Sequence, residues 1–141
     1  MVAKRLVEQE NVVALIGPTR TGTGMAVKKY LEEKQIPTVM TVGGDPVIME
    51  GMHGGKNFGT AKWIFKSPQR SSVAVKKVYQ YLRAKKVKNI ALITASDGFG
   101  RDGKRWLTKL APDYGLEVVA DESFGVRDAD MTTQLTKIKN T

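Results

Sequence analysis

The sequence contains no cysteine and only one histidine, His53, among its 141 residues. The absence of cysteine excludes disulfides, thiolate metal sites and a cysteine nucleophile, although it is compatible with any cellular compartment. His53 lies in a glycine-rich stretch, where a solvated loop residue is the simpler interpretation, and no G-x-S-x-G sequence accompanies it. No group of carboxylates has the spacing of metal ligands. We therefore expect a protein that is not an enzyme and that needs no cofactor or metal.

Long hydrophobic runs are also missing. No apolar stretch reaches the roughly 18 residues that a membrane-spanning helix requires. The first ten residues read as a charged amphipathic helix, whereas a signal peptide has a charged start followed by an apolar block. The sequence as written therefore predicts neither a membrane span nor a signal peptide.

Negative charge is scarce relative to positive charge, since the net charge is +9. Such a balance makes a basic nucleic-acid-binding module one alternative. The lysines and arginines, however, are spread over three predicted helices and alternate with apolar residues, as is typical of solvated helix faces. Because no DNA- or RNA-binding motif accompanies them, we expect no nucleic-acid partner.

Short apolar runs alternate with helical patterns along the chain. Continuously apolar runs at 12–16, 38–42 and 90–94 suit parallel strands covered on both faces, and residues 116–120 form a further strand candidate. The apolar helix faces expected between and after them are Ala26, Val27, Tyr30 and Leu31; Ala74, Val78, Tyr81 and Leu82; Trp106, Leu107, Leu110, Ala111 and Tyr114; and Met131, Leu135 and Ile138. This alternation predicts an α/β fold with right-handed crossovers.

Residues 43–60 interrupt this rhythm. They contain six glycines and one proline, which predicts a loop. A short aromatic strand follows at 62–66, whose Trp63 and Phe65 are expected to pack in a core or hinge. We place a boundary there, between one part comprising residues 1–66 and a second comprising residues 67–141.

The segment 17–24 joins a strand candidate to a helix and is rich in glycine and threonine. Hydroxyls and free N–H groups at a helix N-terminus favour an anion, because the helix dipole is positive there. Two interpretations stay open: Thr21 and Thr23 bind a ligand carboxylate, or one of them caps the helix. The segment is not a Walker A element, because Thr23 stands where that motif requires lysine.

Residues 98–103 match G-x-G-x-x-G between a strand and a helix, with Asp121 and Glu122 placed like a ribose-binding acid. A Rossmann-like nucleotide-binding domain is therefore the alternative function. Gly98 nevertheless follows the strand too late for the tight dinucleotide turn, so a glycine-rich loop holding Phe99 at a cleft edge is the simpler interpretation. Several aspartates are expected to be turn and cap residues: Asp45, Asp97, Asp102, Asp121 and Asp128.

Eight short stretches follow one another in a familiar order: 3–6, 13–19, 43–46, 63–69, 90–93, 97–100, 111–115 and 134–139. Together they resemble the branched-chain amino-acid receptor family of ABC transporters, over almost the whole chain. The resemblance implies a type I periplasmic-binding fold, with parts of two three-layer α/β/α lobes joined by a hinge crossover. It also implies a solute-binding function for an ABC-type importer, a membrane permease as partner, and a periplasmic or extracellular location for the full-length protein.

The same resemblance implies which residues contact the ligand. The hydroxyl-rich loop is expected to bind a carboxylate, the next loop and the crossover to add contacts, and an aromatic side chain to cover the ligand. The residues at these positions are Thr21, Gly22, Thr23, Gly43, Gly44, Gln69 and Phe99.

Two departures from the family pattern change the expectation. Gly43 and Gly44 stand where amino-acid-binding members usually carry a small side chain with a hydroxyl nearby. The ligand is therefore left open among an amino acid, an aromatic acid and another small carboxylate or amide. Family members also extend further at both ends, so we expect a fragment whose incomplete sheets leave unpaired strand edges and promote self-association.

Overall fold

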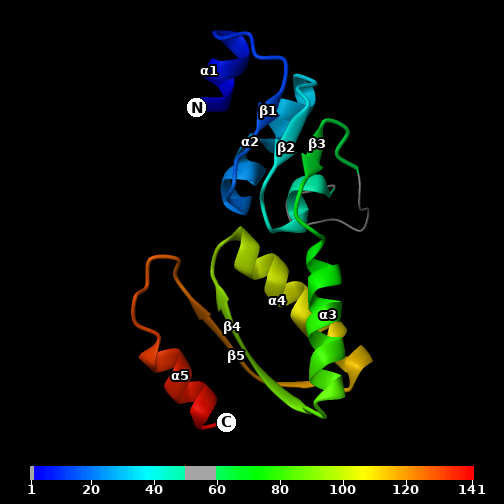
Figure 1. Ribbon diagram of the computed structural model, residues 1–141. Helices are drawn as coiled ribbons and strands as arrows, with labels where there is room; N and C mark the ends of the chain where they lie inside the picture. Colours follow the sequence, from blue (N-terminus) through cyan, green and yellow to red (C-terminus); the bar gives the residue numbers. More distant parts are fainter. Residues whose placement is uncertain (1, 50–59) are drawn as a thin grey trace. The chain divides into compact units, whose positions relative to one another are not determined.

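The computed structural model describes residues 2–49 and 60–141 (Figure 1). The chain divides into two compact units, Met1–Gln69 and Arg70–Thr141, and the sequence placed this division slightly earlier, after residue 66. His53 lies outside the described residues. Within the described ranges, no helix combines the length and the apolar character needed to cross a membrane.

The first unit contains a parallel sheet with the strand order β1–β2–β3. Its elements are α1 (Val2–Glu8), β1 (Leu15–Ile16), α2 (Thr21–Glu33), β2 (Thr38–Met40), the 3-10 helix η1 (Asp45–Ile48) and β3 (Ile64–Lys66). The strands are shorter than the apolar runs that predicted them. Part of the predicted loop is instead η1, which buries Val47.

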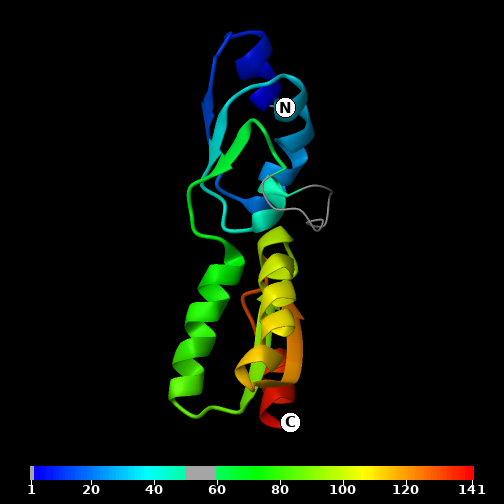
Figure 2. The same ribbon diagram turned by 90° about the vertical axis from the view of Figure 1, so that its right-hand side faces the viewer.

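Helices α1 and α2 cover the same face of this sheet (Figure 2). The core beneath them consists of buried aliphatic and methionine side chains: Val27, Leu31, Met40, Val42, Val47 and Ile64. The carboxylate of Glu32 accepts hydrogen bonds from the backbone N–H groups of Lys62 and Trp63, at 3.0 and 2.8 Å. The end of α2 is thereby tied to the chain entering β3.

The opposite face of the same sheet carries a row of exposed apolar side chains. The strand register places Ile16 beside Val39 and Val39 beside Phe65, and these residues are 88%, 41% and 55% exposed. The prediction that these strands are covered on both faces is therefore wrong for the described residues. Of the predicted core or hinge packing of Phe65, its exposure excludes the core. Because the strand order advances in one direction, right-handed crossovers place their connections on one face only.

The second unit is built on the parallel pair β4 (Asn89–Ala95) and β5 (Glu117–Phe124). Its other elements are α3 (Ser71–Ala84), α4 (Gly98–Leu110), the 3-10 helix η2 (Pro112–Tyr114) and α5 (Thr132–Lys139). Helices α3 and α4 lie on one side of the strand pair and α5 on the other (Figures 1 and 2). The described part of this unit therefore has three layers.

The buried face of α3 differs from the predicted one. Val75 and Tyr79 are buried, whereas Val78 and Tyr81 are 51% and 62% exposed. The Tyr79 hydroxyl donates to the Leu107 carbonyl at 2.8 Å, which turns this ring toward α4. Both residue pairs have helical spacing, so the spacing alone did not distinguish them.

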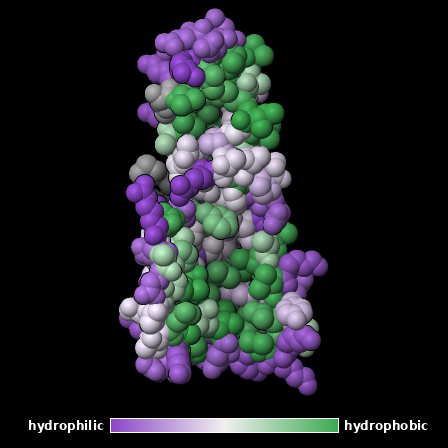
Figure 3. Space-filling model, turned by 60° about the vertical axis from the view of Figure 1, so that its left-hand side comes forward, coloured by the Kyte–Doolittle hydropathy of each residue, from purple (hydrophilic) through white to green (hydrophobic). Residues whose placement is uncertain are grey.

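The predicted faces of the other helices agree better with the structure. Val27 and Leu31 of α2 are buried, as are Trp106, Leu110 and Ala111 at the α4 face. Leu135 of α5, by contrast, is 56% exposed. Apolar side chains consequently reach the surface in both units (Figure 3).

Candidate functional site

The carboxyl ends of β1, β2 and β3 lie along one edge of the first sheet, because all three strands are parallel. Backbone hydrogen bonds hold the departing segments together, from Thr41 N–H to the Pro18 carbonyl (3.2 Å) and from Ser67 N–H to the Met40 carbonyl (3.0 Å). In open α/β sheets, ligands bind outside this edge. Six predicted ligand residues follow these three strand ends: Thr21, Gly22, Thr23, Gly43, Gly44 and Gln69.

Thr21 is 3% exposed, and its hydroxyl accepts a hydrogen bond from the backbone N–H of Gly44 at 3.0 Å. A Cβ atom added at Gly44 would lie 2.6 Å from Cγ2 of Thr21. Thr21 therefore fills the space beside the loop after β2 and fixes the backbone of that loop. The N-cap residue of α2 is Arg20, so the interpretation in which a threonine caps this helix is wrong.

The N-termini of α2 and α4 differ in what occupies them. At α4, the carboxylate of Asp97 accepts hydrogen bonds from Phe99 N–H and Gly100 N–H, at 3.1 and 2.9 Å, as predicted for a cap. At α2, the N-cap residue makes no side-chain capping hydrogen bond. An anion approaching the start of α2 therefore meets the positive end of the helix dipole without competition from a carboxylate cap.

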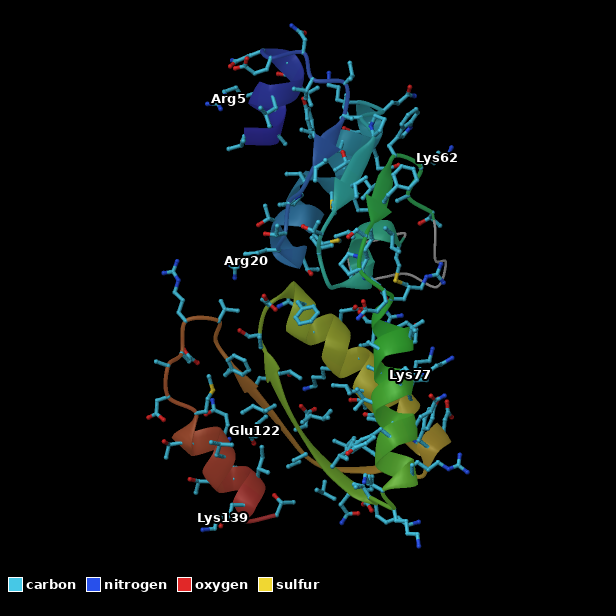
Figure 4. All side chains as sticks on the ribbon, viewed as in Figure 1. Arg5, Arg20, Lys62, Lys77, Glu122 and Lys139 are labelled. Atoms are coloured by element: carbon cyan, nitrogen blue, oxygen red, sulfur yellow. The ribbon has the colours of Figure 1, made fainter. Side chains whose placement is uncertain are left out.

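Two exposed side chains flank the start of α2. Thr23 and Arg20 are both exposed, and Arg20 extends outward from the end of the helix (Figure 4). A guanidinium group binds a carboxylate with two parallel hydrogen bonds. The sequence analysis missed Arg20, although its place directly before the threonine- and glycine-rich turn was the available signal.

The loop after β2 is held by a lysine of α2. The Lys28 ammonium donates to the Pro46 carbonyl at 3.1 Å and to the Met49 carbonyl. A lysine in a helix is expected to be solvated, so this contact could not be predicted from the residue pattern. The result is a loop whose path is fixed on the side facing α2.

On its other side, the same loop is joined to β3 through Asp45 and Lys66. Nζ of Lys66 lies 3.4 Å from Oδ1 of Asp45, and the two side chains are 2% and 0% exposed. The same ammonium donates to the carbonyls of Pro68 and Gln69, at 3.3 and 2.5 Å. Asp45 lies in the first turn of η1, but its carboxylate also forms a buried ion pair that was not predicted, since a buried carboxylate requires a partner of opposite charge.

Two further aspartates also differ from the predicted turn and cap roles. Asp102 is 3% exposed and accepts a hydrogen bond from the Ser71 hydroxyl at 2.6 Å, which links α4 to the start of α3. Asp121 lies on β5, 2.7 Å from the Lys104 ammonium. In contrast, Asp128 accepts from Gly125 N–H at 2.7 Å, as a turn residue does.

Phe99 is the predicted ligand residue of the second unit. It is 55% exposed and lies in the first turn of α4, which follows the carboxyl end of β4. Its neighbour Gly100 is buried, and a Cβ atom there would lie 1.9 Å from the carbonyl oxygen of Ala95. The glycine at position 100 is thus explained by close packing of helix on strand.

The same geometry argues against a nucleotide at residues 98–103. The amides that a phosphate needs are already bonded to the Asp97 carboxylate, and that negative charge repels a phosphate. The candidate ribose-binding acid Asp121 is paired with Lys104. The motif is therefore a helix start, and the Rossmann-like alternative loses its structural support.

Two cavities lie away from most of these residues. One of about 300 Å³ is bordered by α1, β1 and α2, with Thr23 as its polar side chain, and is lined by Val2, Ala3, Leu6, Leu15, Ile16, Gly17, Pro18, Thr23, Val27 and Leu31. Another of about 470 Å³ in the second unit is lined by Arg83, Lys86, Val87, Lys88, Asp113, Tyr114 and Gly115. Within the described ranges, no group of side chains has the make-up of a metal site.

Comparison with known proteins places this geometry in context. A family model described as a periplasmic binding protein matches residues 1–141. The chain is similar to an extracellular ligand-binding receptor from Rhodopseudomonas palustris HaA2, with a TM-score of 0.87 and 22% identity over 98% of this chain and 37% of that one. At this identity the structural similarity shows the fold alone.

Two other similar structures were solved with ligands. One is a solute-binding protein of an ABC transporter from R. palustris in complex with benzoate (TM-score 0.83, 20% identity, 99% of this chain and 37% of that one). The other is a solute-binding protein of an ABC transporter from R. palustris HaA2 in complex with p-hydroxybenzoic acid (TM-score 0.84, 20% identity, 99% and 35%). The chain thus spans little more than a third of each of these proteins.

Proposed function

Because this chain belongs to the periplasmic binding protein family, we propose that the full-length protein binds a small carboxylate and delivers it to an ABC-type importer. The predicted α/β fold of the type I periplasmic-binding class is confirmed. Members of this family are periplasmic or extracellular receptors rather than enzymes. Since the chain spans 37% of a similar receptor, the ligand, the permease partner and the location of the whole protein are parts of this proposal.

The start of α2 is the observation that carries the proposal. It lies at the carboxyl edge of a parallel sheet, has no side-chain cap, and is flanked by the exposed Arg20 and Thr23. Backbone N–H groups at such a helix end, together with a hydroxyl and a guanidinium, match the acceptor oxygens of a carboxylate. Thr21 supports this arrangement indirectly, because it holds Gly44 in place.

The charges at the same edge favour an aromatic or other simple carboxylate over an amino acid. A carboxylate is the strongest protein partner for an α-ammonium group, and Asp45 is the acid found in the segments 17–24, 41–49 and 67–69 that follow the three strands. Asp45 is fully buried against Lys66 and is therefore committed elsewhere. The ligands named for the similar proteins, benzoate and p-hydroxybenzoic acid, carry a carboxylate and no amine.

Gly43, Gly44, Gln69 and Phe99 remain proposed ligand contacts. Gly43 leaves backbone rather than a side chain along the loop after β2, which gives space for a ring, whereas the space beside Gly44 is filled by Thr21. Phe99 is exposed on the second unit, and an aromatic side chain suits stacking on an aromatic acid. Gln69 is exposed at the end of the first unit and offers an amide donor.

Calorimetric titration of the full-length protein tests the proposal. Benzoate and 4-hydroxybenzoate are expected to bind, whereas benzamide, which has the same ring without the charge, is expected to bind at least about tenfold more weakly. Arg20→Gln should weaken the binding of benzoate by roughly 10- to 100-fold, the range expected for the loss of a charged hydrogen bond. Lys62→Gln is the matched control, because Lys62 is an exposed cation of the same unit that lies two residues before β3.

Two results would overturn the proposal at different levels. Binding of leucine without binding of aromatic acids would contradict the ligand class while leaving a receptor function in place. Absence of binding across amino acids and small carboxylates would contradict the receptor function itself. Equal effects of Arg20→Gln and Lys62→Gln would remove the start of α2 from the site.

A further inference from the structure

The buried ion pair between Asp45 and Lys66 connects two separate parts of the proposed site. Asp45 directly follows Gly44, and Lys66 is the last residue of β3, where the chain leaves for the second unit. The two side chains are 0% and 2% exposed, with 3.4 Å between Oδ1 and Nζ. Desolvating two charges costs several kcal/mol for each ion, so such a pair is often no more stabilising than apolar residues of similar volume. Its presence at this point suggests a positional role rather than a contribution to stability.

The hydrogen bonds of Lys66 show what it positions. An ammonium group has three donors and no acceptor, and here its contacts are the Asp45 carboxylate and the carbonyls of Pro68 and Gln69. The first contact belongs to the loop after β2, and the other two belong to the crossover between the units. One buried side chain therefore holds both segments.

The loop is fixed independently on its opposite side. Gly44 N–H donates to the Thr21 hydroxyl, and Gly44 and Asp45 are adjacent in the chain. A displacement of the Gly44 backbone is therefore transmitted to Asp45 by the covalent chain, and from Asp45 to the crossover through Lys66.

We infer that Asp45 and Lys66 form a positioning pair. This pair makes the loop after β2 and the crossover between the units, to which Pro68 and Gln69 belong, move together. The inference rests on the proposed function, in which residues 43 and 44 contact the ligand. Neither Asp45 nor Lys66 touches the ligand, because both side chains are buried. A ligand that holds the Gly44 backbone thereby also holds the carbonyls of Pro68 and Gln69, at the point where one unit joins the next.

Hydrogen exchange of two backbone amides, followed by NMR, tests the coupling in the chain without ligand. Gly44 N–H donates to Thr21 and Ser67 N–H donates to the Met40 carbonyl, so both amides are protected and one lies in each segment. Lys66→Met removes all three donors and is expected to accelerate exchange at both amides by roughly 10- to 100-fold. Thr38 N–H, which donates to the Trp63 carbonyl within the sheet, reports whether the unit as a whole has opened.

Three further variants separate positioning from stability. Lys66→Arg keeps the charge and the donors, and should restore most of the protection at Gly44 and Ser67. Asp45→Asn combined with Lys66→Met replaces both charged side chains of the pair by neutral ones, so it should fold even if Lys66→Met alone does not, and should still show fast exchange at both amides. Ser71→Ala is the matched control. It removes a partly buried hydrogen bond to Asp102 in the second unit and should leave the exchange rate of the Gly44 amide unchanged.

The outcomes are distinct. In Lys66→Met, fast exchange at only one of the two amides, Gly44 or Ser67, would overturn the coupling. Exchange at both amides of the double variant that is as slow as in the parent chain would also overturn it. In the full-length protein, benzoate should protect both amides in the parent and Gly44 alone in the Lys66→Met variant. If no carboxylate binds, the proposed function fails, whereas the ligand-free exchange rates still decide whether the pair couples the two segments.

Discussion

The backbone N–H of Gly44 donates to the hydroxyl of Thr21 across 3.0 Å, at a position where the chain has no space for a side chain at residue 44. The contact joins the start of α2 to the loop after β2. A hydroxyl thus does lie beside the loop after β2, but it comes from α2 and already accepts a hydrogen bond from the backbone of that loop. Thr21 therefore fixes the path of this loop at the carboxyl edge of the sheet.

Gly44→Ala is expected to destabilise the first unit. The new Cβ atom would lie 2.6 Å from Cγ2 and 2.9 Å from Oγ1 of Thr21, and overpacking of this kind costs about 1–3 kcal/mol. Denaturant unfolding measures the effect. Gly22→Ala is the control, because a Cβ atom there meets nothing within 4 Å.

Adding Thr21→Ser to Gly44→Ala should recover part of the lost stability. Serine retains the hydroxyl that accepts from residue 44 and lacks the methyl group with the closest contact. A double variant no more stable than Gly44→Ala would show that the cost arises from the backbone rather than from this contact.

Gly100→Ala is expected to disrupt the second unit, whether or not nucleotides are present. Its Cβ atom would lie 1.9 Å from the Ala95 carbonyl oxygen, whereas at Gly103 nothing lies within 4 Å. Thermal unfolding should therefore show a large loss for Gly100→Ala and none for Gly103→Ala. Stabilisation of the parent chain by NAD or ATP would contradict our assignment of residues 98–103 as a helix start.

Tyr79 should make the second unit sensitive to high pH. Burial raises the pKa of its hydroxyl above the ordinary value of 10.0. The associated stability is fully present below pH 10 and is lost as the pH rises through the raised pKa. Tyr79→Phe should reduce this loss, although at neutral pH it should cost about 1 kcal/mol, because the hydrogen bond from the Tyr79 hydroxyl to the Leu107 carbonyl is lost.

Chemical denaturation at pH 8 and at pH 11 measures this difference. Tyr81→Phe is the control, since Tyr81 is 62% exposed and its replacement should leave the pH dependence unchanged. Identical pH profiles for the parent and for Tyr79→Phe would exclude Tyr79 as the group responsible.

The exposed row Ile16, Val39 and Phe65 should promote self-association of this chain. Apolar faces and strand edges left uncovered favour contacts between copies, and Phe65 is 55% exposed at the edge strand β3. Phe65→Glu should lower the concentration dependence of the apparent mass in sedimentation experiments. Gln80→Glu adds the same charge at an exposed position of α3 and should have no effect; a parent chain that stays monomeric at millimolar concentration would contradict this prediction.

Residue patterns were enough to predict the fold class and the family. Apolar runs at 38–42 and 90–94, with helical spacing between such runs, are local patterns, and local patterns suffice to predict β-α alternation. The ordered stretches from 13–19 to 134–139 identified the receptor family, which the match over residues 1–141 confirms. The expected ligand residues could also be named from the sequence, because they come after the predicted strands along the chain.

The contacts between distant residues could not be predicted in this way. Val75 is buried and Val78 is exposed. Both positions suit an apolar helix face, so the surface that packs against α3 selects between them. The pairing of Asp45 with Lys66 depends on β2 and β3 being neighbours, and neither residue carries a local signal of it. One face of the first sheet stays exposed because successive crossovers advance in the same direction. These features all depend on contacts between segments distant in sequence, which are set by strand order and packing rather than by local residue patterns.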